Sequence, residues 1–376
     1  AQLREKMAFF WHGHFACRNN NIFYNQLLLH VFRKYGLGDF GTLLREVSRS
    51  AAMLYFLNNQ QNRKGRPNEN FAREVMELFT LGRGNYTESD VKEAARAFTG
   101  WTATGKGEFV FRQNNHDDGG KTLLGKTGNF NGDDVLNIIL ENKQTAKFIT
   151  RKIYTFFVNE KTDEAIINQL SEKFYNSKYD IAALMETIFT SKWFYDLQHI
   201  GARIKSPVEL IVGIQRMIPM KLDNDYALFN LQKILGQQLL YPPNVAGWAG
   251  GRSWIDSSTL MMRLRIPQMF NNKDELNVTP KQDDDLMMGR KTDGTASVPE
   301  KVTTPQKKRY GTIDASIDWQ QYVEKYNETK KEQLLAAIKN NLFLLNGSKI
   351  EEAIVKNIDN SSREAYIKSA TVQLSI

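Results

Sequence analysis

The chain has 376 residues, 41% of them hydrophobic and 11% aromatic, so it can bury a sizeable core as one large domain or two. No apolar stretch approaches the roughly 18–20 uninterrupted residues that a membrane-spanning helix needs. The 50 Lys and Arg residues exceed the 42 Asp and Glu residues, which gives a net charge of +8 and a pI near 9.2. This balance is compatible with anionic polymers, nucleic acid or acidic membrane surfaces. Because charges of both signs alternate and form no basic stripe, we expect no nucleic-acid binding.

Helical periodicity dominates the chain. Phe23, Leu27, Val31 and Tyr35, for example, recur at four-residue intervals and form one apolar face. The predicted helices span residues 23–35, 40–57, 70–81, 87–98, 133–140, 144–158, 164–175, 181–190, 207–217, 226–235 and 257–269. The helix over 70–81 should stop at Gly82, and Thr87 with its acidic following turn should cap the next one.

Strands are predicted at only one place. Residues 108–112 (EFVFR) and the short TLLG at 122–125 should form a small β-hairpin that brackets NNHDDGGK. The segment YPPNVAGWAGG, which begins at Tyr241, is predicted to be a rigid loop. The predicted fold class is therefore mainly α, a multi-helix globular domain with a small β-hairpin.

The composition changes after residue 270. Residues 1–270 are predicted to form the main helical domain, with its polar cluster in residues 1–122. Residues 271–314 have almost no apolar periodicity and are predicted to be a linker or a flexible insertion. Residues 315–376 return to helices, from Trp319 through Ile358.

Several strings resemble the bacterial domain of unknown function 1800 family. They are FWHGHF, PNENFAREVMELFTLGRGNYTESDVKEAARAFTGW, HDDGGKTLLGKTGNFNGDD, KSPVEL and PPNVAGWAGG, and the match runs from about Leu3 to Leu264. The resemblance implies a mostly helical, exported bacterial protein of the periplasm or cell surface, often with a sulfatase-like exported partner. The helices that usually precede FWHGHF are missing, so we expect a fragment or a processed form. The resemblance implies no known reaction or cofactor.

The motif FWHGHF contains His12 and His14, two residues apart. On a strand the two rings would share a face, whereas on a helix they would diverge by about 200°. A metal site would need further ligands, with Glu69, Glu74, His116 or Asp117 as candidates. The alternative is one histidine packed on Trp11 and the other exposed. No metal ligands are assigned, because this spacing differs from the HExxH pair of metalloproteases.

The Asn-rich segment from Asn58 to Glu77 supplies most of the other candidates. If a helix begins near Asn70, then Asn70, Arg73 and Glu74 form a polar stripe. One interpretation makes Glu69 or Glu74 a general acid or base, with Asn68, Asn70 and Arg73 binding an anionic ligand. The other has Asn68 capping the helix while Glu74 and Glu77 meet arginines such as Arg96 in a salt-bridge network.

The loop NNHDDGGKT contains His116, Asp117 and Lys121. A carboxylate beside an imidazole can orient the ring or raise its pKa, which suits proton transfer. The segment nearly matches the phosphate-binding pattern GxxxxGK[ST], but Asn115 replaces the first glycine and no helix follows, so we reject ATP binding. A hairpin loop stabilised by Asp side chains is the alternative.

Trp248 and Trp254 follow the prolines of the YPPNVAGWAGG segment and could stack on sugar rings if exposed, although such residues are more often in the core. Neither a Ser-His-Asp order nor GxSxG occurs, and Cys17 has no evident base partner.

Two functional hypotheses follow. The first is an exported protein that binds or hydrolyses an extracellular polymer or an anionic ester through a cleft of His, Glu, Asn and Arg. In that cleft Glu74 or His116 handles the proton, while Arg73 and Lys121 stabilise negative charge. The second is a non-catalytic scaffold or assembly partner of the cell envelope, which uses the polar insertion around residues 283–309 as a docking segment.

Overall fold

The computed structural model describes residues 2–222, 225–272, 315–343 and 352–375. The chain divides into two compact units. Unit 1 comprises residues 1–203 together with 240–248, and unit 2 comprises residues 204–239 and 249–376. The chain therefore leaves unit 1 after Arg203, returns for one short segment, and leaves it again. The domain boundaries predicted near residues 270 and 314 remain predictions.

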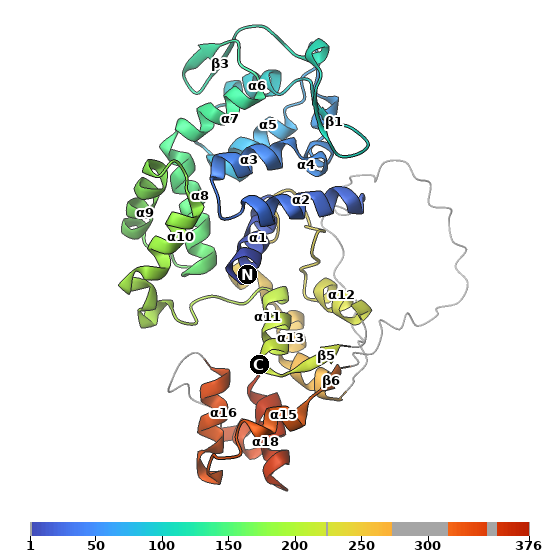
Figure 1. Cartoon of the computed structure of the whole chain (residues 1–376), viewed down its shortest axis with the longest axis vertical. Helices are drawn as coiled ribbons and strands as arrows, with labels where there is room; N and C mark the ends of the chain where they lie inside the picture. Colours follow the sequence, from blue (N-terminus) through green and yellow to red (C-terminus); the bar gives the residue numbers. More distant parts are fainter. Residues whose placement is uncertain (1, 223–224, 273–314, 344–351, 376) are drawn as a thin grey trace, which may run out of the picture. The chain divides into compact units, whose positions relative to one another are not determined.

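Unit 1 is an assembly of helices (Figure 1), and its buried core is rich in aromatic side chains. Its α-helices are α1 (Gln2–His14), α2 (Ile22–Tyr35), α3 (Phe40–Arg49), α4 (Ala51–Phe56), α5 (Asn70–Glu74), α6 (Glu88–Ala97), α7 (Gly132–Glu141), α8 (Lys143–Phe157), α9 (Glu164–Asn176) and α10 (Ile181–Thr190). Most of them begin at an Asn, Asp, Ser or Thr side chain that accepts from the first free backbone N–H groups.

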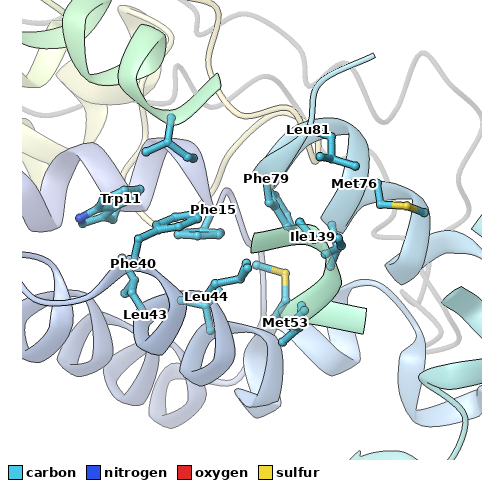
Figure 2. Close-up of a cluster of buried hydrophobic side chains, with 14 of the residues drawn as sticks. Trp11, Phe15, Phe40, Leu43, Leu44, Met53, Met76, Phe79, Leu81 and Ile139 are labelled. Atoms are coloured by element: carbon cyan, nitrogen blue, oxygen red, sulfur yellow. The ribbon is translucent and has the colours of Figure 1, made fainter. Parts of the chain in front are cut away.

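The centre of unit 1 is fully buried. Figure 2 shows part of this cluster, in which Trp11 of α1 and Phe15, just after that helix, approach Phe40 of α3, and Phe79 lies next to them. The rings of Trp11 and Phe40 stack with centroids 5.6 Å apart, and those of Phe15 and Phe79 meet edge to face at 5.3 Å. Other labelled members are Leu43, Leu44, Met53, Met76, Leu81 and Ile139. The α1 segment is thus a central element of the fold.

Two of the predicted helices are interrupted. The helix expected over 40–57 breaks at Ser50, whose extended backbone (ψ 138°) ends α3 and whose hydroxyl caps α4. The helix expected over 70–81 begins at Asn70 as predicted. After Glu74 it widens into a π-helix, η2 (Val75–Thr80), before the predicted stop at Gly82. π-Helical turns are rare, and apolar periodicity alone does not predict them.

The predicted hairpin pairing is wrong. Strand β2 (Phe109–Phe111) pairs with β1 (Trp101–Ala103), and β3 (Lys121–Leu123) pairs with β4 (Lys126–Gly128). Each strand therefore takes its nearest neighbour in sequence. Leu124 and Gly125 both have positive φ, as the two-residue turn between β3 and β4 requires. The His116 loop lies between two hairpins instead of inside one.

Unit 2 contains a second set of helices. These are α11 (Pro207–Met217), α12 (Asp225–Ile234), α13 (Ser257–Asn272), α15 (Trp319–Glu324), α16 (Leu334–Leu342), α17 (Glu352–Lys356) and α18 (Arg363–Leu374). Strands β5 (Met220–Leu222) and β6 (Ala315–Ile317) pair antiparallel. One apolar cluster joins α11, α12 and α13, and another joins α15, α16 and α18.

The mainly α fold is confirmed. Most of the predicted insertion (273–314) lies outside the described residues, and so does the basic string QKKRY that ends at Tyr310. Within the described part of the chain, no helix has the length and apolar character to cross a membrane.

Candidate functional site

The two histidines of FWHGHF lie on regular α-helix, so their rings diverge and enter different surroundings. His12 is buried, with 7% of its surface exposed. Its Nε2 accepts a hydrogen bond from the backbone N–H of Leu240 at 2.9 Å, and its ring stacks on Trp248 with centroids 5.0 Å apart. Since Nε2 is the acceptor, the ring is neutral and Nδ1 carries the proton.

The segment Leu240–Trp248 is fastened to α1 by further contacts. Leu240 holds a left-handed backbone conformation (φ 60°), which costs a non-glycine residue roughly 1–2 kcal/mol. Gly247 lies so close to Gly13 that a Cβ atom there would be 2.7 Å from the Gly13 carbonyl oxygen. The Arg18 guanidinium stacks on the Tyr241 ring at 4.6 Å. The predicted rigid loop is therefore a docked segment, and His12 is its polar anchor.

Burial lowers the pKa of His12 to about 4, because the charged ring would lose its hydration. At neutral pH the imidazole therefore stays an acceptor for Leu240. Its Nδ1 has no hydrogen-bond partner among the described residues.

The His14 side chain forms a hydrogen bond with the π-helix η2. Its Nε2 bonds the carbonyl oxygen of Phe79 at 3.0 Å, near the C-terminal end of η2, where carbonyls lack helical donors. Its ring lies parallel to Phe10 and edge-on to Phe15. Burial, together with the positive charge of Lys152, lowers its pKa to about 3 despite the Phe79 hydrogen bond. The ring is therefore neutral and acts as a donor to a helix end.

The Asn-rich segment is held together by its own amides. Asn62 donates to the Ala95 carbonyl at 2.8 Å and accepts from the Asn68 N–H at 2.9 Å. The Asn68 side chain accepts from the N–H of Asn70, the first residue of α5, at 3.0 Å, although Glu69 and not Asn68 holds the N-cap position. Asn70 donates to the Leu57 carbonyl at 3.2 Å. The two asparagines predicted to bind a ligand, Asn68 and Asn70, thus have intramolecular partners.

Arg73 is bonded to two carboxylates. Its two terminal nitrogens each lie 2.7 Å from an oxygen of Glu88, and Nη2 also lies 3.2 Å from Glu69. Glu69, a predicted acid or base, thus faces the guanidinium that was expected to bind an anion. Glu74 is partly buried and also interacts with another group of the protein. Glu77 pairs with Arg83 and with Tyr86, not with Arg96, so this part of the predicted network is corrected.

The His116 loop folds against the turn that follows α6. His116 is 4% exposed, and its Nδ1 lies 3.0 Å from the Thr99 carbonyl oxygen and 3.2 Å from the Thr99 hydroxyl. The Asp117 carboxylate binds Nε and Nη2 of Arg96 at 2.9 and 3.2 Å and does not bind His116. This ion pair holds the pKa of Asp117 at about 2. The adjacent histidine and aspartate therefore have separate partners.

Lys121 is the most deeply buried of these charges, at 1% exposure. Its ammonium donates to the carbonyl oxygens of Asp117 and Gly119 at 2.6 and 2.9 Å, and to the Asn129 side chain at 3.4 Å. Burial lowers its pKa, whereas Asp117 opposes that change. The ammonium thus satisfies three oxygens as a hydrogen-bond donor, and these bonds stabilise the loop between the two hairpins.

The remaining candidates lie in different places. Trp254 belongs to unit 2 and is 9% exposed, and Trp248 of unit 1 lies against His12. In the described part of the chain, no group of three or more His, Cys, Asp and Glu side chains is placed to hold a metal ion. Cys17 is buried, which raises the pKa of its thiol.

Of the three polar motifs (FWHGHF, the Asn-rich segment and the His116 loop), the structure brings two into contact. The Asn-rich segment and the His116 loop meet at residues 95–101, where Gly100 donates to the Asn62 carbonyl and accepts from the Arg112 N–H. His12 and His14 contact the 240–248 segment and η2 instead. Sequence reasoning missed three exposed arginines at the meeting point, namely Arg63, Arg66 and Arg112. The string RKGR was the available signal for the first two.

Together these features define a mainly helical protein of two units, in which the polar side chains of the N-terminal unit are bonded within the fold. The chain belongs to the family described as protein of unknown function (DUF1800), whose model matches residues 1–374. No curated protein matches the chain, and no solved structure does either.

Proposed function

We propose that this protein binds an anionic polymer outside the cytoplasm and does not hydrolyse it. Of the two activities considered from the sequence, binding or hydrolysis of an extracellular polymer or anionic ester, the geometry favours binding. Export to the periplasm or cell surface, and association with a sulfatase-like exported partner, are parts of the proposal that rest on the family resemblance.

The observation that carries the proposal is that the acid–base candidates have intramolecular partners. A general acid or base must reach a substrate proton within about 2.6–3.2 Å. Asp117 binds Arg96, Glu69 binds Arg73, and His116 bonds to Thr99. A carboxylate whose pKa is held at about 2 is a weak base at neutral pH, which further disfavours Asp117 as a proton acceptor.

The charge balance supports an anionic ligand. The chain has an excess of eight positive charges, and most arginines in the described part of unit 1 are bonded within the fold. Positive charges without such partners attract polyanions, and this attraction weakens as salt screens it.

The test is a binding and turnover assay on the purified chain. Polygalacturonate and dextran sulfate are the anionic probes, and uncharged dextran is the matched control. Binding is followed by co-sedimentation in steps of salt, and the same samples are analysed for shortened chains and released sulfate. We expect both anionic probes to bind and to dissociate as salt rises, with no binding to dextran and no product.

Product release would contradict the proposal, above all if His12→Ala or Glu74→Gln abolished it while the melting temperature stayed unchanged. Equal binding to dextran would also contradict it, because charge would then not be the basis of recognition.

A further inference from the structure

One exposed surface of unit 1 differs from the rest in its charge pairing. Among the described arginines of this unit, all but four contact a carboxylate, a carbonyl oxygen or an aromatic ring. The four without such a contact are Arg4, Arg63, Arg66 and Arg112. Three of these four lie on two neighbouring backbone segments.

Backbone hydrogen bonds hold these two segments together. Arg63 to Arg66 form a tight turn closed by the Arg66 N–H and the Arg63 carbonyl at 2.9 Å. The Lys64 N–H donates to the Asn115 carbonyl at 2.7 Å, and the Asn115 N–H donates back to the Arg112 carbonyl at 2.9 Å. The turn and the end of β2 are therefore fixed side by side.

The charges of the loop that contains His116 cancel one another. Arg96 and Lys121 offset Glu93 and Asp117 in the network beneath the loop. At the surface, Lys64 lies 4.0 Å from Asp118 and offsets it. Arg63, Arg66 and Arg112 then contribute three positive charges without a carboxylate partner among the described residues.

An exposed aromatic side chain is next in sequence to one of these arginines. Phe111 precedes Arg112 and is 39% exposed, and its ring meets the buried His116 ring at 5.2 Å, which fixes its position. An apolar ring of this kind can pack against the C–H face of a sugar, while guanidinium groups pair bidentately with carboxylate or sulfate.

We propose that the surface formed by Arg63, Arg66, Phe111 and Arg112, here named the arginine surface, binds an acidic polysaccharide through its carboxylate or sulfate groups. This assignment rests on the proposed function and adds to it the place of binding and the class of ligand. A polysaccharide is favoured because the surface is open, lies on rigidly held backbone, and combines an aromatic ring with unpaired guanidiniums.

The test compares two triple variants with the same change in charge. Arg63→Gln/Arg66→Gln/Arg112→Gln removes the arginine surface. Arg4→Gln/Lys92→Gln/Lys161→Gln removes three exposed charges elsewhere on unit 1. All six side chains are exposed, so both variants should keep the fold, which circular dichroism and thermal melting verify.

Binding to polygalacturonate and dextran sulfate is measured at low salt. We expect the arginine-surface variant to lose about 30-fold in affinity, as three modest ion pairs imply, and the matched variant to lose less than about threefold. A conservative Arg63→Lys/Arg66→Lys/Arg112→Lys variant should lose an intermediate amount, because Lys keeps the charge but not the bidentate geometry.

Equal losses in the two Gln variants would overturn the site, although binding by the wild type would leave the proposed function standing. Absence of wild-type binding to either probe would remove both proposals. A length-matched single-stranded DNA serves as the last arm. If it binds more tightly than the polysaccharides and depends equally on the arginine surface, nucleic acid is the ligand and the polysaccharide assignment is wrong.

Discussion

The hydrogen bond between His12 and Leu240 should control whether the 240–248 segment stays on α1. His12→Ala removes the acceptor of the Leu240 N–H and the ring that stacks on Trp248. We expect the segment to open locally while the rest of unit 1 stays folded.

The size of the effect follows from the contacts. Leaving a partly buried N–H without a partner costs about 1–3 kcal/mol, and losing an aromatic stacking contact costs about 0.5–1.5 kcal/mol. The left-handed backbone of Leu240 also loses what holds it in place. We expect the free energy of opening this segment to fall by about 2–4 kcal/mol.

The stability that His12 gives to the docked 240–248 segment should decrease as pH falls. The pKa of His12 is lowered from 6.5 to about 4 in the folded chain, so the neutral ring stabilises the fold above pH 6.5 and this contribution is lost as pH falls toward 4. The difference between the two pKa values corresponds to about 3 kcal/mol at neutral pH. His12→Gln keeps a side-chain acceptor but cannot titrate in this range.

The assay is hydrogen exchange of the 240–248 backbone measured between pH 4 and 7.5, corrected for intrinsic rates. The control is His30→Ala, which changes an exposed histidine of α2 in the same unit. His12→Ala should raise exchange of this segment at neutral pH, and the wild type should approach it as pH falls to 4. Unchanged protection of the Leu240 amide in His12→Ala would show that His12 does not hold this segment. A wild-type profile as flat with pH as that of His12→Gln would show that titration of His12 does not control its opening.

Three other substitutions test the internal bonding. Lys121→Met leaves three oxygens without their donor and should destabilise unit 1 by about 2–4 kcal/mol in chemical denaturation, whereas exposed Lys106→Met should change little. Asp117→Asn should cost about 2 kcal/mol at neutral pH, and the wild type should lose this advantage as pH falls from 3.8 to about 2, because the folded pKa is lowered; a pH-independent difference would contradict the ion pair. Gly132→Ala places a Cβ atom 2.4 Å from the Trp101 ring and should cost about 3 kcal/mol or more, whereas Gly120→Ala meets nothing within 4 Å and should melt like the wild type.

Much of the fold could be predicted from local pattern. Apolar spacing located most helices, and Thr87 and Gly82 marked a start and a stop that the structure confirms. The π-helix η2 could not be predicted from periodicity, whereas the break at Ser50 has a local signal, its capping hydroxyl, which apolar spacing does not detect. The strand pairing was wrong because local turns prevailed over the longer connection.

The candidate site could be predicted only as a list of residue types. Its partners come from distant positions, such as Leu240 for His12, which is 228 residues away, and Thr99 for His116. Backbone atoms supply many of these bonds, and they carry no sequence signal. The same polar residues that suggest catalysis therefore serve to satisfy buried hydrogen bonds. The arginine surface was missed because Arg112 is far from the RKGR string in sequence.

Isothermal titration calorimetry of the wild-type chain with a sulfated oligosaccharide distinguishes binding from hydrolysis, because one experiment reports both association and turnover. We expect discrete heats that saturate and return to baseline, with an affinity that falls as salt is added. A sustained heat signal proportional to the protein concentration, with accumulation of desulfated or shortened sugar, would contradict it.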